Sequence, residues 1–443
     1  MINFPAIVRV LGVLLLIIGL LMWTGLPVSY LFDSGDMGAI GWSGLVCVGI
    51  GGFFWWATPR DDRAVRKREG YLIVALGWLV MTTFGMLPYL LSGVIPHVAD
   101  AFFETVSGMT TTGASVLTDI EAAPEGILYW RSLTQWIGGM GIIVLTVAIF
   151  PLLGIGGVEL FVAEAPGPTS DKLHPRISET AKRLWLIYVG LTGVLCLLLF
   201  AEGMTFYDAV NHALTTMATG GFSTKNASMA AFSPAIQYTT AVFMFLAGTN
   251  FTVTYFALKG RFSRVWASDE FKAYVFMIVL FTVAVTLSIH AAVDISWEQA
   301  FRDGMFQVLS LITTTGFVSA DYTAWSGGLT LFFFILLFVG ASAGSTSGGI
   351  KVIRHLVFFK NSFLEFKRIL HPRAIVPLRL NGEVVKGRII THIIIFLLLY
   401  MMIFLLGSLV LAWMGMDFMT AIGAVATSLG NVELRASAKW RPM

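Results

Sequence analysis

The sequence predicts an all-α polytopic membrane protein with two N-terminal helices followed by four pseudosymmetric membrane–pore-loop–membrane repeats, the fourth of them incomplete. The 443-residue chain is 56% hydrophobic and only 12% charged, with a mean hydropathy of +0.80, whereas soluble domains carry about 25% charged residues. Apolar stretches of about 20 residues, enough to cross a bilayer, recur along the chain. A short polar pattern also occurs four times between them.

In each copy of this pattern, an acidic residue is followed 13 positions later by a glycine in a turn of small residues. The four pairs are Asp100 and Gly113, Asp208 and Gly221, Asp303 and Gly316, and Asp417 and Gly430. Four similar segments, each beside long apolar runs, indicate a pore lined by four short loops around one pathway.

The basic residues fix the predicted topology. Of the 29 Lys and Arg residues, 22 lie in four loops at 60–68, 172–183, 259–272 and 351–388. The positive-inside rule makes these loops cytoplasmic, so the glycine turns open toward the other side. The alternative is a basic patch that binds nucleic acid or lipid, and the last loop could contact anionic lipid headgroups. The topological and lipid interpretations do not exclude each other.

Two helices near 7–31 and 40–57 form a predicted N-terminal segment over residues 1–60. The apolar run of the first is longer than a signal-peptide core and no small-residue cleavage site follows it, so we expect it to be retained. Both cysteines, Cys47 and Cys196, lie in apolar runs. A structural disulfide is therefore not expected.

Each repeat is predicted as a long helix, a short helix, the turn and a second long helix. The repeat boundaries are 61–165, 166–262, 263–360 and 361–443. The expected helices are 71–95, 100–110 and 130–162, then 183–203, 207–218 and 235–259, then 272–293, 297–313 and 328–358, and finally 387–414 and 417–428. The chain ends in ELRASAKWRPM, which is too polar to cross a bilayer, so the fourth repeat is expected to lack its last helix.

The short helices are predicted to enter the membrane without crossing it. A helix of about 10 to 12 residues reaches roughly half of a 30 Å hydrocarbon core, and non-helical backbone at that depth must face protein or water. The acid that heads each helix suits an N-cap, where a carboxylate accepts unpaired backbone N–H groups. This structural role is assigned to Asp100, Asp208, Asp303 and Asp417.

The turns offer backbone carbonyl oxygens, and stacked rings of such oxygens can replace the hydration shell of a monovalent cation. Glycine adopts the backbone angles that such a turn requires, and the C-terminal ends of the short helices add partial negative charge. The alternative for a single small-residue turn is close packing of membrane helices. Four such turns at one spacing favour the ion pathway.

A run of ten small residues interrupts the predicted helix 328–358, and we expect it to bend or unwind there. This candidate gating loop could plug the pathway, the alternative being a close-packing seam between helices. Its residues are Gly340, Ala341, Ser342, Ala343, Gly344, Ser345, Thr346, Ser347, Gly348 and Gly349. Lys351 and Arg354 follow, at the expected cytoplasmic mouth. The seven histidines show no metal-ligand spacing, and His212 is interpreted as a packing residue.

Five segments resemble the Trk/Ktr/HKT superfamily of potassium transporters, most closely its TrkH branch. They are TVSGMTTTGAS, HALTTMATGGFST, VLSLITTTGF, GASAGSTSGGIKVIR and TSLGNV. The resemblance spans about residues 70 to 431 and implies potassium-selective uptake across a bacterial inner membrane. It departs from the family pattern after Asn431, where no final helix follows and no position matches the basic residue that family members carry there, close to the gating loop.

The resemblance also implies the site and the partners. It implies a potassium filter, with K⁺ as the transported ion, and an intramembrane gating loop over the ten-residue run. Gly220 and Gly221 both remain candidates for the second filter glycine, the 13-residue spacing favouring Gly221. The implied filter residues are Thr111, Thr112, Gly113, Thr219, Gly220, Gly221, Thr314, Thr315, Gly316, Leu429, Gly430 and Asn431. It further implies a Trk-system symporter, a homodimer and a cytosolic nucleotide-binding regulatory ring of the RCK/KTN type, with no organic cofactor in this chain.

Two other function classes fit less well. An ion-coupled secondary transporter of a small solute would also use broken helices, but with inverted repeats and ionisable groups on its spanning helices. Here like-sided basic loops make the repeats parallel, and the spanning helices are nearly free of charge. A membrane enzyme would need clustered ionisable residues at membrane depth. The sequence shows no such cluster, so we expect no enzymatic activity.

Overall fold

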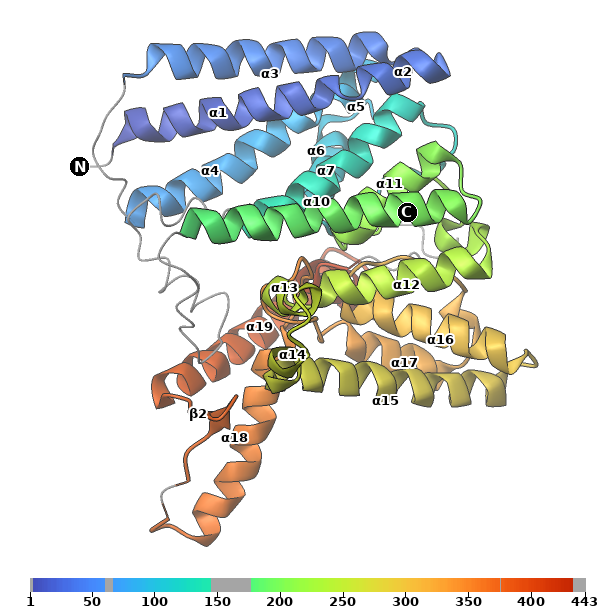
Figure 1. Ribbon diagram of the computed structural model, residues 1–443. Helices are drawn as coiled ribbons and strands as arrows, with labels where there is room; N and C mark the ends of the chain where they lie inside the picture. Colours follow the sequence, from blue (N-terminus) through green and yellow to red (C-terminus); the bar gives the residue numbers. More distant parts are fainter. Residues whose placement is uncertain (1–2, 60–66, 145–176, 375, 433–443) are drawn as a thin grey trace. The chain divides into compact units, whose positions relative to one another are not determined.

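The computed structural model describes residues 3–59, 67–144, 177–374 and 376–432, which are almost entirely helical (Figure 1). The chain forms two compact units. Unit 1 contains Met1–Leu160 and Arg176–Ser228, and the described part of unit 2 lies within Met229–Met443. Two of the predicted pore loops therefore belong to each unit.

The N-terminal helices of unit 1 are joined by closely approaching backbones. A Cβ atom added at Gly12 would lie 2.8 Å from the carbonyl oxygen of Gly51, and one at Gly19 would lie 2.8 Å from that of Gly44. Small residues of this kind let membrane helices pack tightly. The helices are α1 (Phe4–Trp23), α2 (Leu26–Phe32) and α3 (Met37–Ala57).

The other helices of unit 1 belong to the first two repeats. They are α4 (Lys67–Gly85), α5 (Leu87–Ser92), α6 (Val98–Met109), α7 (Glu125–Val144), α10 (Ile177–Ala201) and α11 (Phe206–Met217). Helix α7 packs against the ends of both short helices, because Gly138 lies against the carbonyl of Met109 and Gly139 lies against Ala218. The part of the predicted helix 130–162 beyond residue 144 lies outside the described residues.

Unit 2 contains the helices of the third and fourth repeats and the last long helix of the second. They are α12 (Pro234–Gly248), α13 (Phe251–Leu258), α14 (Phe262–Ala267), α15 (Asp269–Ala292), α16 (Trp297–Ile312), α17 (Gly327–Leu336), α18 (Val352–Leu370), α19 (Gly387–Trp413) and α20 (Phe418–Gly430). Short 3-10 turns cover Ser228–Ala231 and Tyr322–Ala324, and the antiparallel strands are β1 (Arg379–Leu380) and β2 (Glu383–Val384). The polar tail at 433–443 lies outside the described residues.

Within the described residues, six helical segments are long and apolar enough to cross a membrane. They are Phe4–Phe32, Met37–Ala57, Glu69–Ser92, Arg183–Ala201, Asp269–Ala292 and Gly387–Trp413. Helices α12 and α13 together form a further pair, bent by 111°. The prediction of one continuous helix over 235–259 is therefore wrong. The side chain of Asn250 accepts a hydrogen bond from the N–H of Thr252 and starts a new helix after the break.

The predicted helix 328–358 is also interrupted, at the place where the sequence suggested that it would unwind. Helix α17 ends at Leu336, α18 begins at Val352, and the ten small residues between them are not helical. The two ends of this loop are hydrogen-bonded to each other. The N–H of Gly340 donates to the carbonyl of Ile350 at 2.8 Å, and that of Val352 donates to Ala341 at 3.1 Å.

The predicted N-cap role of the four acids does not hold for three of them. His97, Thr205 and Ser296 are the N-cap residues of α6, α11 and α16. Asp100 and Asp208 lie in the first turn, and Asp303 lies further into a longer helix. Only α20 begins as predicted among these four helices, with Asp417 accepting a hydrogen bond from the N–H of Thr420.

Candidate filter loops and gating loop

Three of the predicted filter loops share one backbone conformation. Each short helix is followed by a threonine with positive φ and, two residues later, by a glycine with positive φ. The values are 58° at Thr111, 53° at Thr219 and 55° at Thr314, and 88° at Gly113, 79° at Gly221 and 84° at Gly316. A β-branched residue rarely adopts this left-handed region. Such strain persists only where the surrounding structure enforces it, which is characteristic of functional sites.

The same hydrogen bond ends all three helices. The N–H of the residue after each threonine donates to a carbonyl five positions back, as in a helix C-terminal motif. These bonds join Thr112 to Ser107, Gly220 to Thr215 and Thr315 to Ser310, at 2.8–2.9 Å. This register aligns Gly221, not Gly220, with Gly113 and Gly316.

The fourth loop has a different register from the one that the sequence spacing predicts. Asn431 has a φ of 57°, and the N–H of Val432 donates to the carbonyl of Thr427 at 3.0 Å. Asn431 is therefore the equivalent of the three left-handed threonines. Leu429 and Gly430 are the last two residues of α20.

The predicted equivalence of Gly430 with the other three glycines is wrong. A Cβ atom at Gly430 would lie 2.7 Å from the carbonyl oxygen of Leu337, so a helix contact explains this glycine. The 13-residue spacing misled because Asp417 heads its helix, whereas the other acids lie inside theirs. The residue aligned with the three glycines is Glu433, which lies outside the described residues.

Side chains brace the loops in different ways. In the first and third loops, hydroxyl groups pair at 2.8 Å, Thr110 with Thr112 and Thr313 with Thr315. In the second loop, the side-chain amide of Gln135 replaces this pair of hydroxyl groups. Its Nε2 donates to the carbonyl of Gly220 at 2.6 Å, and its Oε1 accepts from the N–H of Phe222 at 3.1 Å.

Gly220 is required by this brace, because a Cβ atom there would overlap the side chain of Gln135. The first and second loops also touch directly. A Cβ atom at Gly113 would overlap the carbonyl oxygen of Gly220. The contact between the two loops therefore requires glycine at position 113.

A polar residue seven positions before each left-handed threonine reaches the segment that returns from the turn. Glu104 accepts hydrogen bonds from the N–H of Val116 at 2.9 Å and from the Ser115 hydroxyl at 3.0 Å. The Nε2 atom of His212 lies 2.9 Å from Ser223 Oγ, and Gln307 donates to the carbonyl of Ala320 at 3.3 Å. The three residues were not predicted as a series, although their fixed spacing is visible in the sequence.

Glu104 also forms a buried ion pair in unit 1. Its Oε1 lies 2.6 Å from Nε of Arg131, and both side chains are at most 2% exposed. Arg131 stacks on the ring of Phe222, 3.4 Å from its centroid, and donates to the carbonyl of Ser223 at 3.3 Å. One arginine therefore links the pore helix α6 to the second loop.

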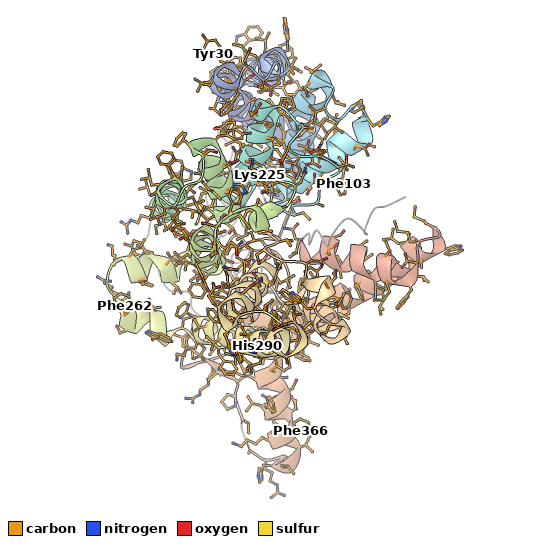
Figure 2. The ribbon with its side chains drawn as sticks, turned by 90° about the vertical axis from the view of Figure 1, so that its right-hand side faces the viewer. Tyr30, Phe103, Lys225, Phe262, His290 and Phe366 are labelled. Carbon is orange, nitrogen blue, oxygen red and sulfur yellow. The ribbon has the colours of Figure 1, made fainter. Side chains whose placement is uncertain are left out.

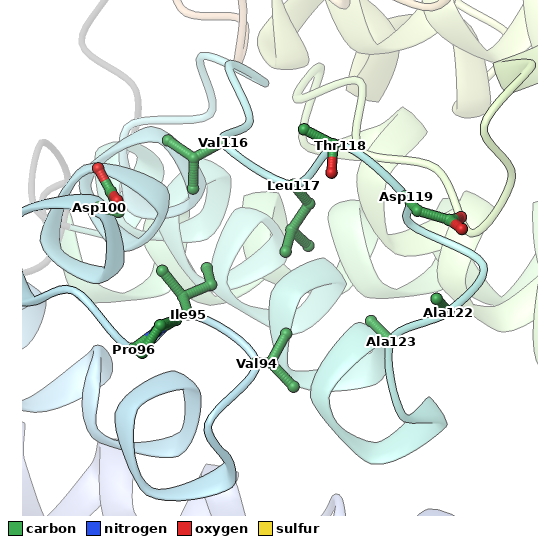
Figure 3. Close-up of a pocket in the computed structure, with 10 residues that line it drawn as sticks. All are labelled: Val94, Ile95, Pro96, Asp100, Val116, Leu117, Thr118, Asp119, Ala122 and Ala123. Carbon is green, nitrogen blue, oxygen red and sulfur yellow. The ribbon is translucent and has the colours of Figure 1, made fainter.

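Two of the acids that do not cap their helices face the returning segments instead. Asp208 accepts a hydrogen bond from the Thr224 hydroxyl at 2.5 Å. Asp100 lines a pocket of about 330 Å³ together with Asp119, which lies on the far side of it (Figure 3). Asp119 in turn accepts from the side chain of Asn226 at 2.7 Å.

The predicted gating loop packs against the break between α12 and α13. The last carbonyl groups of a helix have no hydrogen-bond donor within that helix. At the end of α12, the predicted gating loop supplies the donors. The N–H of Ser342 donates to Gly248 at 3.1 Å, and the Thr346 hydroxyl donates to Ala247 at 3.4 Å. In return, the carbonyl of Gly344 accepts from the N–H of Phe251 at 3.2 Å.

The gating loop also contacts the left-handed residues of the third and fourth loops. The N–H of Gly348 donates to the hydroxyl of Thr314 at 2.5 Å. A Cβ atom at Gly348 would lie 2.7 Å from Cβ of Asn431 and 2.9 Å from the carbonyl oxygen of Gly430. Gly348 therefore lies between two predicted filter loops, where a side chain would collide with both.

Two charged residues form hydrogen bonds with the gating loop. Glu270, at the start of α15, accepts from the N–H of Ala343 at 2.6 Å. The ammonium group of Lys351 donates to the carbonyl of Ser347 and lies 3.1 Å from its hydroxyl. The loop thus has defined partners at its middle and at its C-terminal end.

The family description "TrkH: Cation transport protein" matches residues 39–436. The chain belongs to this family. It is 39% identical to the Trk system potassium uptake protein TrkH of Salmonella typhimurium and 38% identical to that of Escherichia coli K12, covering 97% of this chain and 90% of each relative. It is also 34% identical to the Escherichia coli protein TrkG, over 87% of this chain and 80% of that relative.

A solved structure has the same fold. The crystal structure of the potassium transporter TrkH from Vibrio parahaemolyticus superposes with a TM-score of 0.88 and 36% sequence identity. The match covers 98% of this chain and 90% of that chain. Both the helical membrane architecture and the family assignment predicted from the sequence are confirmed.

Proposed function

We propose that this chain carries potassium ions across the inner membrane of a bacterium. The observation that supports this most is the repeated loop backbone, with a left-handed residue at the same place in all four loops. The relatives in the same family are named as potassium uptake proteins. An ion-coupled transporter of another solute has no comparable support.

In this proposal, the four loops surround one pathway and K⁺ is the cargo. Carbonyl and hydroxyl oxygens of the threonine and glycine turns replace its water shell. In unit 1, Gln135 and Arg131 hold the loop backbone in place from behind. A braced ring of oxygens favours one ion radius, because a smaller ion cannot pull all its ligands inward.

The gating loop closes the cytoplasmic side of the filter in this proposal. Its contacts with Thr314 and Asn431 keep Gly348 beneath the filter. For ions to pass, the loop must release these contacts. Its small side chains allow such a movement without exposing a bulky apolar core.

Assembly and coupling complete the proposal. We expect a homodimer, with a cytosolic ring of nucleotide-binding RCK/KTN-type subunits acting on the cytoplasmic loops. We also expect uptake by symport. Chemical cross-linking of the membrane-embedded protein and co-purification with such a ring subunit test the partners directly, and uptake at varied external pH and sodium tests the coupling ion.

The decisive test is potassium uptake by cells that lack their own uptake systems, at low external potassium. The chain should restore growth, and Gly316→Ser should lower the preference for potassium over sodium, because a side chain at a φ of 84° distorts the loop. Gly423→Ala is the control, since the Cβ atom there meets nothing within 4 Å. Unchanged ion preference in Gly316→Ser at normal expression would refute the filter assignment.

A further inference from the structure

Helix α18 carries an apolar stripe that no part of the described chain covers. Phe359, Phe363, Phe366 and Leu370 are between 56% and 74% exposed. Their spacing of four, three and four residues places them on one helix face. The opposite face, through Val357 and Leu364, packs against α19 and the segment around the two strands.

The helix does not belong to the membrane-spanning set. Among the described residues, α18 is not one of the helices long and apolar enough to cross a bilayer, because charged residues interrupt it. Lys360 and Lys367 lie along one edge of the apolar stripe, as their positions on the helical wheel require. Helices with an aromatic face and lysines beside it lie in the membrane–water interface.

Contacts place this helix at the cytoplasmic end of a spanning helix. The ammonium group of Lys360 lies 2.9 Å from a carboxylate oxygen of Asp269, the first residue of α15. The N–H of Asp269 donates to the side chain of Asn381, at 2.7 Å. Within unit 2, α18 points steeply away from the direction of α15 (Figure 1). A helix that starts at the membrane surface and turns from the membrane normal stays near that surface.

A second segment of unit 2 has the same chemistry. Helix α14 and its flanks expose Leu258, Phe262 and Trp266, each at least 55% exposed and four residues apart. Arg261 and Arg264 accompany them. Figure 2 shows Phe262 and Phe366 on the outside of unit 2. Both segments lie in loops that the charge distribution makes cytoplasmic.

We propose that α18 lies in the headgroup layer of the cytoplasmic leaflet, with its phenylalanine stripe toward the acyl chains and Lys367 on anionic phospholipid phosphates. Charge complementarity selects this occupant, because the cytoplasmic leaflet carries anionic lipid and each nearby Lys or Arg contributes about 1 kcal/mol of attraction to it. A helix so anchored fixes the C-terminal end of the gating loop, which joins α18 directly after Lys351.

The test uses the full chain in proteoliposomes, with Cys47 and Cys196 replaced by serine. Single cysteines at Phe359, Phe363, Phe366 and Leu370, and at Asn361 and Glu365, carry a nitroxide spin label. Collision rates with oxygen, which partitions into lipid, and with a water-soluble nickel chelate report the depth of each label. The vesicles contain phosphatidylcholine alone or an equal mixture with phosphatidylglycerol.

In mixed vesicles, we expect oxygen collisions to dominate at the four stripe positions and nickel collisions to dominate at Asn361 and Glu365. Lys367→Gln should lower the ratio of membrane-seated to unseated helix about fivefold, which corresponds to one lysine contact. Lys225→Gln, in a loop of unit 1, should leave this ratio unchanged. The collision rates do not depend on potassium transport. Their outcome therefore tests this proposal independently of the proposed function.

Three outcomes would overturn the proposal. Nickel collisions dominating at all six positions would place α18 in water. Low accessibility to both reagents with broadening between labels would show that a second copy of the chain covers the stripe. Equal depth in both vesicle types would remove the role of anionic lipid.

Discussion

The loops of unit 1 and unit 2 share one backbone pattern but are held by different chemistry. In unit 1, long polar side chains fix the loops, through the Glu104–Arg131 ion pair and the Gln135 amide. In unit 2, the left-handed residues Thr314 and Asn431 instead meet the gating loop. The same helix-and-turn motif is therefore held by buried polar side chains in unit 1 and contacts the proposed gating loop in unit 2.

The energies of the two arrangements differ accordingly. Breaking a buried ion pair by removing one partner costs about 3–5 kcal/mol, whereas one neutral hydrogen bond contributes about 1 kcal/mol. The buried ion pair of unit 1 therefore holds its loops in one fixed conformation. The contact between Thr314 and Gly348 is weak enough to be broken in the gating movement that we propose.

The largest effect is expected for Arg131→Met. This change leaves Glu104 buried without its partner, so we expect a loss of about 3–5 kcal/mol of folding free energy and little folded protein. Thermal unfolding followed by size-exclusion chromatography measures it. Lys272→Met is the control, since its side chain is 51% exposed and its partner Asp269 keeps a second partner in Lys360, and exposed pairs contribute about 0–1 kcal/mol. Equal stability of the two variants would disprove the brace.

The register of the fourth loop is tested by Gly430→Ala. The added Cβ atom would press on the carbonyl of Leu337, and overpacking of this kind costs about 1–3 kcal/mol. Gly423→Ala in the same helix has open space and should be neutral or stabilising by up to about 1 kcal/mol. Melting temperatures of the two purified variants measure the difference. A stable Gly430→Ala protein with altered ion preference would favour the sequence-based register instead.

A smaller effect is expected for Thr314→Val, which keeps the shape of the side chain but removes the acceptor for the Gly348 N–H. Losing about 1 kcal/mol from the closed state raises the open-to-closed ratio about fivefold. Single-channel or flux recordings measure this ratio. Thr219→Val, at the equivalent backbone position in unit 1, should not change it. A matching rise in both variants would show that the gate does not depend on this contact.

The smallest effect is expected for Asp417→Ala, which removes only a helix cap. The hydrogen bond from Thr420 lowers the pKa of Asp417. Its stabilising contribution is therefore fully present above the unfolded-chain pKa of about 4 and is lost as the pH falls through the lowered folded value. A small fall in melting temperature at neutral pH should disappear in acid. Ser296→Ala, which removes an uncharged cap, should show no such pH dependence.

Several features could be predicted because they depend on local composition. Apolar runs located the spanning helices, and the small-residue run predicted where the second long helix of the third repeat unwinds. The break at Thr249 was missed, since its signal is a single Gly–Thr–Asn sequence inside an apolar run. Three cap assignments failed because Asp100, Asp208 and Asp303 lie at one fixed distance from the C-terminal end of their helices. The N-terminal ends of these helices lie before the acids, and not at one fixed distance from them.

The sequence by itself determined the membrane class, the repeat and the family, because these follow from hydropathy and spacing along the chain. Only the tertiary structure decided the partners of the repeated residues. Gly220 is glycine because Gln135 occupies its side-chain space, and Gly430 because Leu337 approaches it. Both contacts join residues far apart in the sequence, and distances between such residues are set by packing.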